Sequence, residues 1–373
     1  MIYFDNAATT LRKPKAVEDA AARAVGTLAS PGRGAYSAAA DAAETAYKCR
    51  ALAANYFNVS SPESVVFTFN ATHGLNIAVN ALSKRGERMV ISGYEHNAVL
   101  RPAAALGAAL AAAQGGLFSH REAIQAFDRA LTNTTRVCVV NHISNVFGFI
   151  QPIEKIAEMC RDRNIPLILD ASQSAGAAEI DFDALGAEFI AMPGHKGLYG
   201  PQGSGLLLCR DAERAIPLLY GGSGSGSKLV DMPMDLPDRL EAGTLNMPGI
   251  AGLYEGLKFV ASEPRILRHE SNVLNYAADG LALNPRIKLF RNSAPGLQSG
   301  VLSFIIHGID CEAAAERLSE RGIAVRAGQH CAPQAHLTAG TANTGTIRAS
   351  FSAFNTLAEA DVFVNAVSEI SRE

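Results

Sequence analysis

The chain has 373 residues, of which 48% are hydrophobic, and its formal net charge is −3. This length suits about two domains with a large buried core. No run of lysines or arginines provides the clustered basic face that nucleic-acid binding needs, and no segment is long and apolar enough for a membrane span, so we expect neither a nucleic-acid nor a membrane partner.

The first third of the chain is rich in alanine and predicts several helices. Residues 1–5 lack the basic start and apolar stretch of a secretory signal, so the reducing cytoplasm is the expected location. Alanine-rich stretches with helical spacing follow, and they predict helices at residues 14–28 and 38–56. The stretch at residues 103–113 suits a tightly packed helix better than a bilayer segment.

Short β-branched runs alternate with helical patterns between residues 65 and 209. The predicted strands lie at residues 65–69, 89–92, 136–140, 167–170, 189–192 and 203–209. Because helical patterns fall between most of these runs, they indicate a mostly parallel sheet covered by helices on both faces. The glycine- and serine-rich stretch 221–227 belongs to this large domain rather than to a linker.

A long helical pattern at residues 250–262 leads into a region with a different rhythm. The strands predicted there are 300–306, 323–326 and 346–350, and the helices are 312–321 and 357–370. Such a mixture is typical of a smaller α+β domain. We therefore predict a large domain at residues 14–250 and a small domain formed by residues 1–13 and 251–373.

An aspartate and a lysine follow two neighbouring apolar runs and together suggest a site for pyridoxal phosphate (PLP). Asp170 closes the run 166–170, and Lys196 lies in the glycine loop 193–197. PLP needs a lysine amine to hold its aldehyde and a carboxylate to keep its ring nitrogen protonated. Open α/β sheets bind ligands at the carboxyl ends of their strands. Taken alone, either residue is more commonly a helix N-cap or a solvated turn residue.

Polar residues also follow other predicted strands. Thr72, at the start of a helical pattern, can hold a phosphate on the free N–H groups of a helix N-terminus, or it is an ordinary N-cap. His96 can stack on a cofactor ring and move protons near neutral pH, although a lone loop histidine is more often solvated. Asn145 and Gln173 can each bond the phenolic oxygen of the ring, and individually both are ordinary polar loop residues.

The six cysteines include no CxxC pair, which argues against a zinc site and a disulfide framework. Cys138 and Cys209 lie in apolar runs and are interpreted as inert core thiols. Cys331 instead lies in a polar loop beside His330, where an accessible thiol near a cation becomes a nucleophile. Arg348 lies within a strand-like run, and a buried arginine needs an anionic partner such as an amino-acid carboxylate.

These residues lie in motifs that, in order over nearly the whole chain, resemble the class V aminotransferase family and within it the cysteine desulfurases. The motifs are YFDNAATT at 3–10, EH at 95–96, DASQ at 170–173, GHKGLYGPQG at 194–203, EAGT at 241–244, QHCA at 329–332 and GTIRASF at 345–351. The short segment from Cys331 to Arg348 is similar to the second type of cysteine desulfurase, which has a compact catalytic loop and often depends on a sulfur-accepting protein.

The resemblance implies a PLP enzyme of fold type I, with a mostly parallel seven-stranded sheet and a smaller C-terminal domain, working as a homodimer with active sites near the subunit interface. It implies conversion of L-cysteine to L-alanine, with the sulfur kept as a persulfide on Cys331. Lys196 would carry PLP, Asp170 would pair with its ring nitrogen and His96 would stack on the ring. The other implied contacts are Gln173 and Asn145 to the phenolic oxygen, Thr72 and His195 to the phosphate, Thr244 to the phosphate of the partner subunit, His73 to the cofactor, and Arg348 and Asn6 to the substrate.

Two positions depart from the pattern of the family, and three alternatives stay open. Pro193 stands where many cysteine desulfurases have a serine that helps to hold the phosphate, and residues 31–34 have glycine where relatives often have histidine. The first alternative is a selenocysteine lyase, acting on L-selenocysteine without needing a protein thiol. The second is an aminotransferase or another PLP lyase, in which Cys331 is incidental. The third is a catalytically silent partner in sulfur transfer, against which the intact Lys196 and Asp170 argue.

Overall fold

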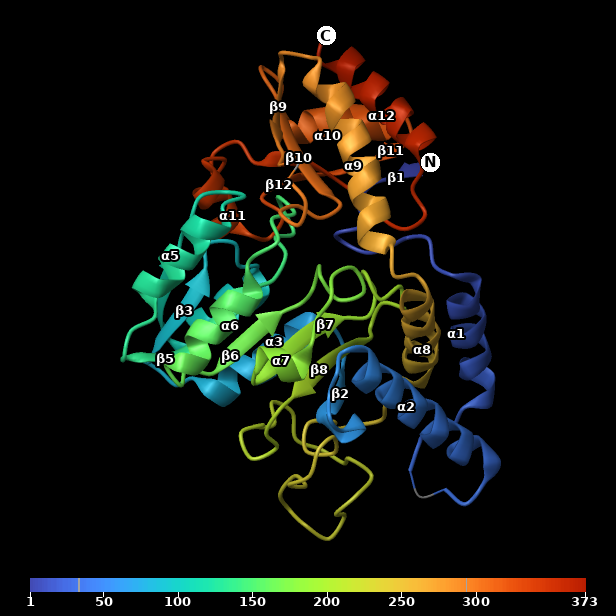
Figure 1. Cartoon of the computed structure of the whole chain (residues 1–373). Helices are drawn as coiled ribbons and strands as arrows, with labels where there is room; N and C mark the ends of the chain where they lie inside the picture. The colour runs from blue at the N-terminus through green and yellow to red at the C-terminus, as the bar shows by residue number, and fades with distance from the viewer. Residues whose placement is uncertain (33, 293) are drawn as a thin grey trace.

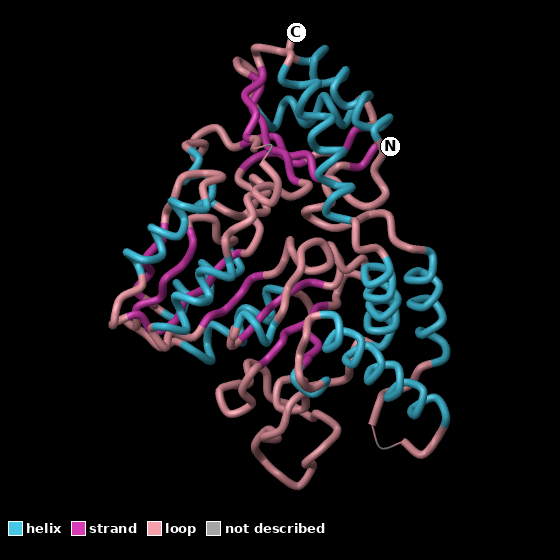
Figure 2. Tube along the Cα trace, in the orientation of Figure 1, coloured by secondary structure: helices cyan, strands magenta, loops and turns pink. Residues whose placement is uncertain are grey.

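The structure, a computed structural model, describes residues 1–32, 34–292 and 294–373. Arg33, in the stretch 31–34 noted above, lies outside the described residues. Figure 1 shows a large sheet with helices around it in one part of the molecule and a smaller group of strands and helices above it. The long segment between the last strand of the large sheet and the next helix, residues 210–246, is drawn entirely as loop in Figure 2.

The large sheet has seven strands in the order β2-β8-β7-β6-β5-β3-β4. All neighbouring pairs are parallel except those made by β8, which runs antiparallel to both β2 and β7. The strands are β2 (Val65–Thr68), β3 (Arg88–Ser92), β4 (Ala109–Ala113), β5 (Thr135–Asn141), β6 (Leu167–Asp170), β7 (Phe189–Pro193) and β8 (Gly205–Cys209). The predicted fold class, a mostly parallel sheet in an α/β chain, is therefore confirmed.

Helices cover both faces of this sheet, which explains why its strands are apolar without interruption. Along β5, Val137 and Val139 pack on one face, whereas Cys138 and Val140 pack on the other. One face is covered by α3 (Ala71–Leu82) and α4 (Asn97–Leu106), and the other by α2 (Ser37–Tyr56), α5 (His120–Ala130) and α6 (Ile153–Asp162). The elements α1 (Lys15–Thr27), α8 (Met247–Ser262), α7 (Phe182–Leu185) and the 3₁₀ turn η1 (Pro62–Ser64) complete this part.

The expectation of a helix at residues 103–113 is wrong over its second half. The helix α4 ends at Leu106, Gly107 adopts a left-handed φ of 72°, and residues 109–113 form the edge strand β4. This strand pairs in parallel with β3 over its whole length, so ladder hydrogen bonds overrule the helix preference of alanine.

A second, antiparallel sheet has the order β12-β13-β10-β9 and packs with four helices. Its strands are β9 (Ile287–Phe290), β10 (Val301–Ile306), β12 (Arg326–Gly328) and β13 (Thr346–Ser350), and its helices are α9 (Ile266–Ala282), α10 (Cys311–Glu320), α11 (Pro333–Ala339) and α12 (Leu357–Ile370). The strand predicted at 323–326 divides into β11 (Ile323–Ala324) and the start of β12. From the other end of the chain, β1 (Ile2–Tyr3) pairs in parallel with β11.

The hydrophobic clusters give the two parts separate cores. Phe4 packs with α9, α10 and α12, as the assignment of residues 1–13 to the small domain requires. Leu253, Leu257 and Val260 of α8 pack instead in the cluster around the large sheet. We keep the division into a large domain at residues 14–250 and a small domain at residues 1–13 and 251–373 as a proposal, and the packing of α8 favours a boundary after this helix, near residue 263.

Candidate functional site

One pocket at the carboxyl ends of the parallel strands brings together most of the predicted residues. The predicted residues that line it are Thr72, His96, Asn145, Asp170, Gln173, His195 and Lys196. They come from the start of α3, from the segments after β3 and β5, and from the segments after β6 and β7. Such a crevice at strand ends is where open α/β sheets bind ligands.

Asp170 is the last residue of β6 and is almost completely buried. Its Oδ1 accepts hydrogen bonds from the backbone N–H of Ser172 at 2.9 Å and from the Ser172 hydroxyl at 2.5 Å. These bonds fix the side chain through one oxygen. Since both bonds use Oδ1, Oδ2 is the oxygen that can accept a hydrogen bond from a ligand.

Lys196 lies in the loop between β7 and β8, and its amine is set up as a nucleophile. Burial lowers the pKa of Lys196 to about 8, although the charge of Asp170 acts in the opposite direction. A larger share of the amine is therefore neutral near pH 7 than for an exposed lysine. Lys196 and Asp170 are held close because their loops touch: a Cβ at Gly176 or Gly197 would collide with the backbone of the other loop.

His96 is the N-cap of α4, and its ring is fixed by this role. Its Nδ1 accepts a hydrogen bond from the backbone N–H of Ala98 at 3.0 Å. Burial lowers the pKa of His96 to about 4. The ring is therefore neutral at physiological pH, and its proton lies on Nε2 because Nδ1 acts as an acceptor.

The start of α3 lines one end of the pocket with Asn70, Ala71 and Thr72. Asn70 caps the helix by accepting from the N–H of His73 at 3.0 Å, and the free N–H groups of Ala71 and Thr72 precede the first intrahelical bonds. Opposite lies His195, whose Nδ1 is buried without a partner and whose pKa burial lowers to about 4. Pro193, where relatives have serine, ends β7 and adds no hydroxyl here.

Asn145 and Gln173 use their amides within the chain. The Asn145 amide donates to the carbonyl of His330 at 2.8 Å, and its Oδ1 is buried without a partner. The Gln173 amide donates to the carbonyl of Ala7 at 2.9 Å. Each side chain lines the pocket and keeps one amide N–H beyond these bonds.

Five predicted residues do not line this pocket: His73, Thr244, Asn6, Arg348 and Cys331. His73 stacks on Phe69, with ring centroids 4.6 Å apart, and lines a neighbouring cavity together with Thr244. Asn6 is buried, and its amide donates to the carbonyl of Ser350 at 2.8 Å and to Oδ1 of Asn355 at 3.1 Å. The amide of Asn6 thus ties the N-terminal segment to β13.

Arg348 is 2% exposed and has its anionic partner inside the chain. Its Nη2 donates to Oδ1 of Asp5 at 2.5 Å, and its Nη1 donates to the carbonyl of Asn145 at 2.9 Å. Nε is buried without a partner. Sequence reasoning predicted that the arginine needs an anion but missed Asp5, although Asp5 lies in the first of the motifs named above.

Cys331 is the one exposed cysteine among the described residues, and its loop lies beside the pocket. Its carbonyl accepts from the backbone N–H of Asn97, the residue after His96, at 2.7 Å. The expectation that His330 supplies a cation near the thiol is wrong. Burial, and next the charge of Arg348, lower the pKa of His330 to about 2, so the ring is neutral, and its Nε2 donates to the carbonyl of Thr346 at 3.1 Å.

Glu95 is a buried residue next to His96. It belongs to the motif at residues 95–96, but the sequence predicted a role for His96 alone. Its Oε1 accepts from the N–H and hydroxyl of Ser92 and from the N–H of Asn141, so it joins the ends of β3 and β5. Burial raises the pKa of Glu95 to about 8. The carboxyl group of Glu95 is therefore protonated at pH 7.

The donor set of the pocket fits PLP. An amine with a lowered pKa, a buried carboxylate with one oxygen to spare and a helix start with free N–H groups at Ala71 and Thr72 lie around one space. The unpartnered Nδ1 of His195 and Oδ1 of Asn145 are polar atoms that a polar ligand would satisfy. Among the described residues, no group of three or more metal-binding side chains occurs, and no helix is long and apolar enough to cross a membrane.

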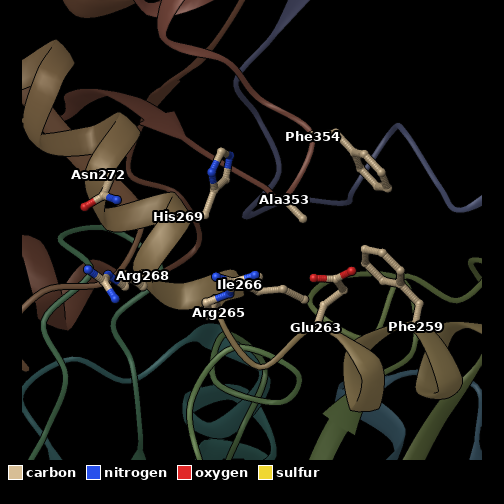
Figure 3. Close-up of a pocket in the computed structure, with 9 residues that line it drawn as sticks. All are labelled: Phe259, Glu263, Arg265, Ile266, Arg268, His269, Asn272, Ala353 and Phe354. Atoms are coloured by element: carbon tan, nitrogen blue, oxygen red, sulfur yellow. The ribbon is translucent and has the colours of Figure 1, made fainter.

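A second hollow, of about 610 Å³, lies between the end of α8, the start of α9 and residues 353–354. Figure 3 shows Arg265, Arg268 and His269 on one side of it and the rings of Phe259 and Phe354 on the other. None of the predicted site residues lines it. The predicted chemistry therefore concentrates in the pocket of Lys196.

Comparisons with known proteins agree with one another. The model of the aminotransferase class-V family matches residues 2–363. A probable cysteine desulfurase of Methanothermobacter thermautotrophicus is 32% identical, and the alignment covers 99% of this chain and 94% of that protein. One of Mycolicibacterium paratuberculosis is also 32% identical, but the chain spans only 55% of its length. The solved structure of a cysteine desulfurase from Thermococcus onnurineus has a TM-score of 0.89 and 30% identity, covering 100% of this chain and 94% of that one.

Proposed function

The chain belongs to the class V aminotransferase family, and on this premise we propose that it is a PLP-dependent cysteine desulfurase. The proposed reaction converts L-cysteine to L-alanine and leaves the sulfur on Cys331 as a persulfide. Members of this family are generally PLP-dependent, and cysteine desulfurases have the α/β architecture of PLP fold type I, which this chain shares. The relatives named above carry the same activity in their names.

The observation that carries the proposal is the contact between the Cys331 loop and the Lys196 pocket. The carbonyl of Cys331 accepts a hydrogen bond from the N–H of Asn97, and the carbonyl of His330 accepts one from the amide of Asn145. An exposed thiol is thereby attached to the rim of a pocket that contains a buried amine and a buried carboxylate. An aminotransferase would need only the amine and the carboxylate.

The residues of the pocket would hold PLP by complementary chemistry. Lys196 would bind its aldehyde, Asp170 would keep its ring nitrogen protonated through Oδ2, and His96 would stack on the ring. The remaining contacts are those of Thr72 and His195 with the phosphate and of Asn145 and Gln173, through their free amide N–H groups, with the phenolic oxygen. His73, which lies outside the pocket, would support the phosphate end from the neighbouring cavity. When bound, PLP supplies an electron sink that stabilises negative charge at the Cα of the substrate.

Arg348 would bind the substrate carboxylate. Its unpartnered Nε shows that Asp5 and the Asn145 carbonyl do not exhaust its donors. Asn6 would act by holding the segment that carries Asp5 against β13. An arginine with an internal carboxylate partner keeps its position before substrate enters, which reduces the entropy lost on binding.

Proton and sulfur transfer would be divided between Lys196 and Cys331. The Lys196 amine, once released, takes the Cα proton of L-cysteine. The Cys331 thiolate attacks the sulfur of the substrate: an S–S bond forms, the Cβ–S bond breaks and its electron pair stays with the substrate carbon. Protonation of Cβ and the return of a proton from Lys196 to Cα then complete L-alanine. The outer sulfur of the persulfide then passes to an external thiol, which in the cell would belong to a sulfur-accepting protein. The exposed position of Cys331 leaves room for such a protein.

We further propose a homodimer in the reducing cytoplasm. Large apolar side chains are exposed on the loop between β8 and α8, a composition typical of an interface; they are Ile216, Leu218, Leu219, Tyr220, Leu229, Val230 and Met234. Thr244 lies on the same loop and faces cavities outside the pocket of its own chain, which suits a contact with the PLP phosphate of a partner. A cytoplasmic location would keep Cys331 reduced.

The decisive experiment measures alanine and sulfide from L-cysteine in the presence of PLP and a reductant. The native protein should produce both in equal amounts, and Cys331→Ala should lose both. Equal alanine production by the two proteins would refute the nucleophile and favour direct expulsion of sulfur. L-selenocysteine is the parallel substrate: a Cys331→Ala variant active on it alone would indicate a selenocysteine lyase. Oxo-acid formation from an added amino donor would indicate transamination.

A further inference from the structure

The loop that carries Cys331 has an unusual backbone. His330 and Cys331 have φ values of 49° and 57°, so two consecutive residues that are not glycine adopt the left-handed conformation. Side chains with a Cβ rarely occupy this region, and they persist there only where surrounding contacts hold them. The contacts that hold these two residues therefore decide where the thiol lies.

Three hydrogen-bonded contacts hold His330 and Cys331 themselves, and the side-chain amide of Gln329 adds a bond to the carbonyl of Ala342 at 2.8 Å. The carbonyl of Cys331 accepts from the backbone N–H of Asn97, and the His330 ring bonds to Thr346. The carbonyl of His330 accepts from the side-chain amide of Asn145 at 2.8 Å. The Asn145 contact joins the loop to the pocket wall through a side chain, and it can be removed by a single substitution.

Asn145 is itself well placed for this task. It is buried, and its own carbonyl accepts from Nη1 of Arg348 at 2.9 Å. Because it also lines the pocket, one residue contacts the loop of the nucleophile, the arginine assigned to the substrate carboxylate and the space assigned to the cofactor. Its amide has two N–H groups, of which the loop uses one.

We propose that Asn145 is a positioning residue that holds the Cys331 loop in its strained conformation and so sets the place of the thiol. This role goes beyond the proposed contact of Asn145 with the phenolic oxygen of PLP. It rests on the proposed function only because it takes Cys331 as the nucleophile. The bond to His330 exists without cofactor, so the effect on the loop is expected in PLP-free protein as well.

The test compares hydrogen exchange of the PLP-free native protein with that of Asn145→Asp and Asn145→Ala. Aspartate keeps the shape but places a carboxylate oxygen against the His330 carbonyl. We expect exchange at residues 329–340 and at the N–H of Asn97 to rise at least about tenfold in both variants. Gln173→Ala is the matched control: it removes another amide from the pocket, one that bonds Ala7 instead, and should leave these rates unchanged.

Kinetics of the PLP-loaded protein supply the second readout. A displaced thiol should lower the turnover of L-cysteine by about 100-fold with little change in KM, in addition to any shift in visible absorption that loss of the contact with the phenolic oxygen produces. A shifted absorption with unchanged loop exchange would overturn the proposal, because it would confine Asn145 to the cofactor. A rise in exchange spread equally over β5 and β13 would overturn it too. If the native protein lacks desulfurase activity, the proposed function fails while the exchange experiment still decides the role of Asn145.

Discussion

The two residues that we propose to react, Lys196 and Cys331, lie in contrasting surroundings. Lys196 follows a central strand of the seven-stranded sheet, and burial lowers its pKa to about 8. Cys331 lies on an exposed loop beside the four-stranded sheet, with a neutral histidine next to it and a left-handed backbone. The contrast suggests a division of labour: burial tunes the amine, which stays in place, whereas the thiol is placed by backbone geometry and stays accessible for the transfer of sulfur.

The largest expected effect is that of removing the amine. Lys196→Ala should lower alanine formation by at least about 10³-fold, because no other group takes the Cα proton. The measurement is the steady-state rate with L-cysteine and PLP, together with visible absorption of the cofactor. Lys155→Ala is the control, since Lys155 is exposed and pairs only with Glu158. Retained activity in Lys196→Ala would show that the buried amine is not needed for the reaction.

The next largest effect is expected from breaking the buried ion pair that holds the arginine. Asp5→Ala should lower the free energy of unfolding by about 2–3 kcal/mol, because it leaves Arg348 buried without its carboxylate. Asp279→Ala, which breaks an exposed pair with Arg291, should cost less than about 1 kcal/mol. Urea unfolding measures both, and equal losses would show that burial does not strengthen the Asp5 pair.

The pKa of Lys196 predicts how fast PLP attaches to cofactor-free protein at different pH values. Burial lowers this pKa, so the neutral amine, which attacks the aldehyde, accumulates as the pH rises toward and past about 8. Between pH 7 and pH 9 the attachment rate should rise about tenfold and then level off. Stopped-flow absorbance measures this rate. A rate that still climbs steeply above pH 9 would place the pKa near that of an exposed lysine.

The smallest expected effect is the selective alkylation of one thiol, that of Cys331. Brief treatment of the native protein with iodoacetamide should modify Cys331 and leave the other five cysteines intact, because they are buried. All six should react after unfolding, and mass spectrometry counts them. Modification of Cys311 at a similar rate in the folded protein would contradict the view that exposure singles out Cys331.

The central sheet could be predicted from the sequence because its signal is local. The apolar run at residues 136–140 is continuous because both faces of β5 are covered, and Asp170 and Lys196 follow neighbouring runs of the same kind. The edge strand β4 was missed because alanine gives no strand signal, and its pairing with β3 depends on tertiary structure.

The contacts between distant segments could not be predicted. Asp5 and Arg348 are 343 residues apart, so their pairing follows only from the folded chain. The neutral state of His330 has the same origin, because its charge is removed by burial and by Arg348, neither of which its neighbours in sequence reveal. The bond from Asn145 to the Cys331 loop likewise joins two motifs that were found separately.

The pairing of the first residues with the last strand has a consequence for synthesis in the cell. Phe4 accepts a hydrogen bond from the N–H of Ser350, and Thr10 bonds the carbonyl of His195 in the Lys196 loop. The N-terminal segment leaves the ribosome first, yet it cannot dock until β13 has emerged, which closes a loop of nearly the whole chain. Nascent chains that end before residue 350 therefore carry Lys196 but lack the docked Asp5, so the proposed site is completed only after β13 has emerged.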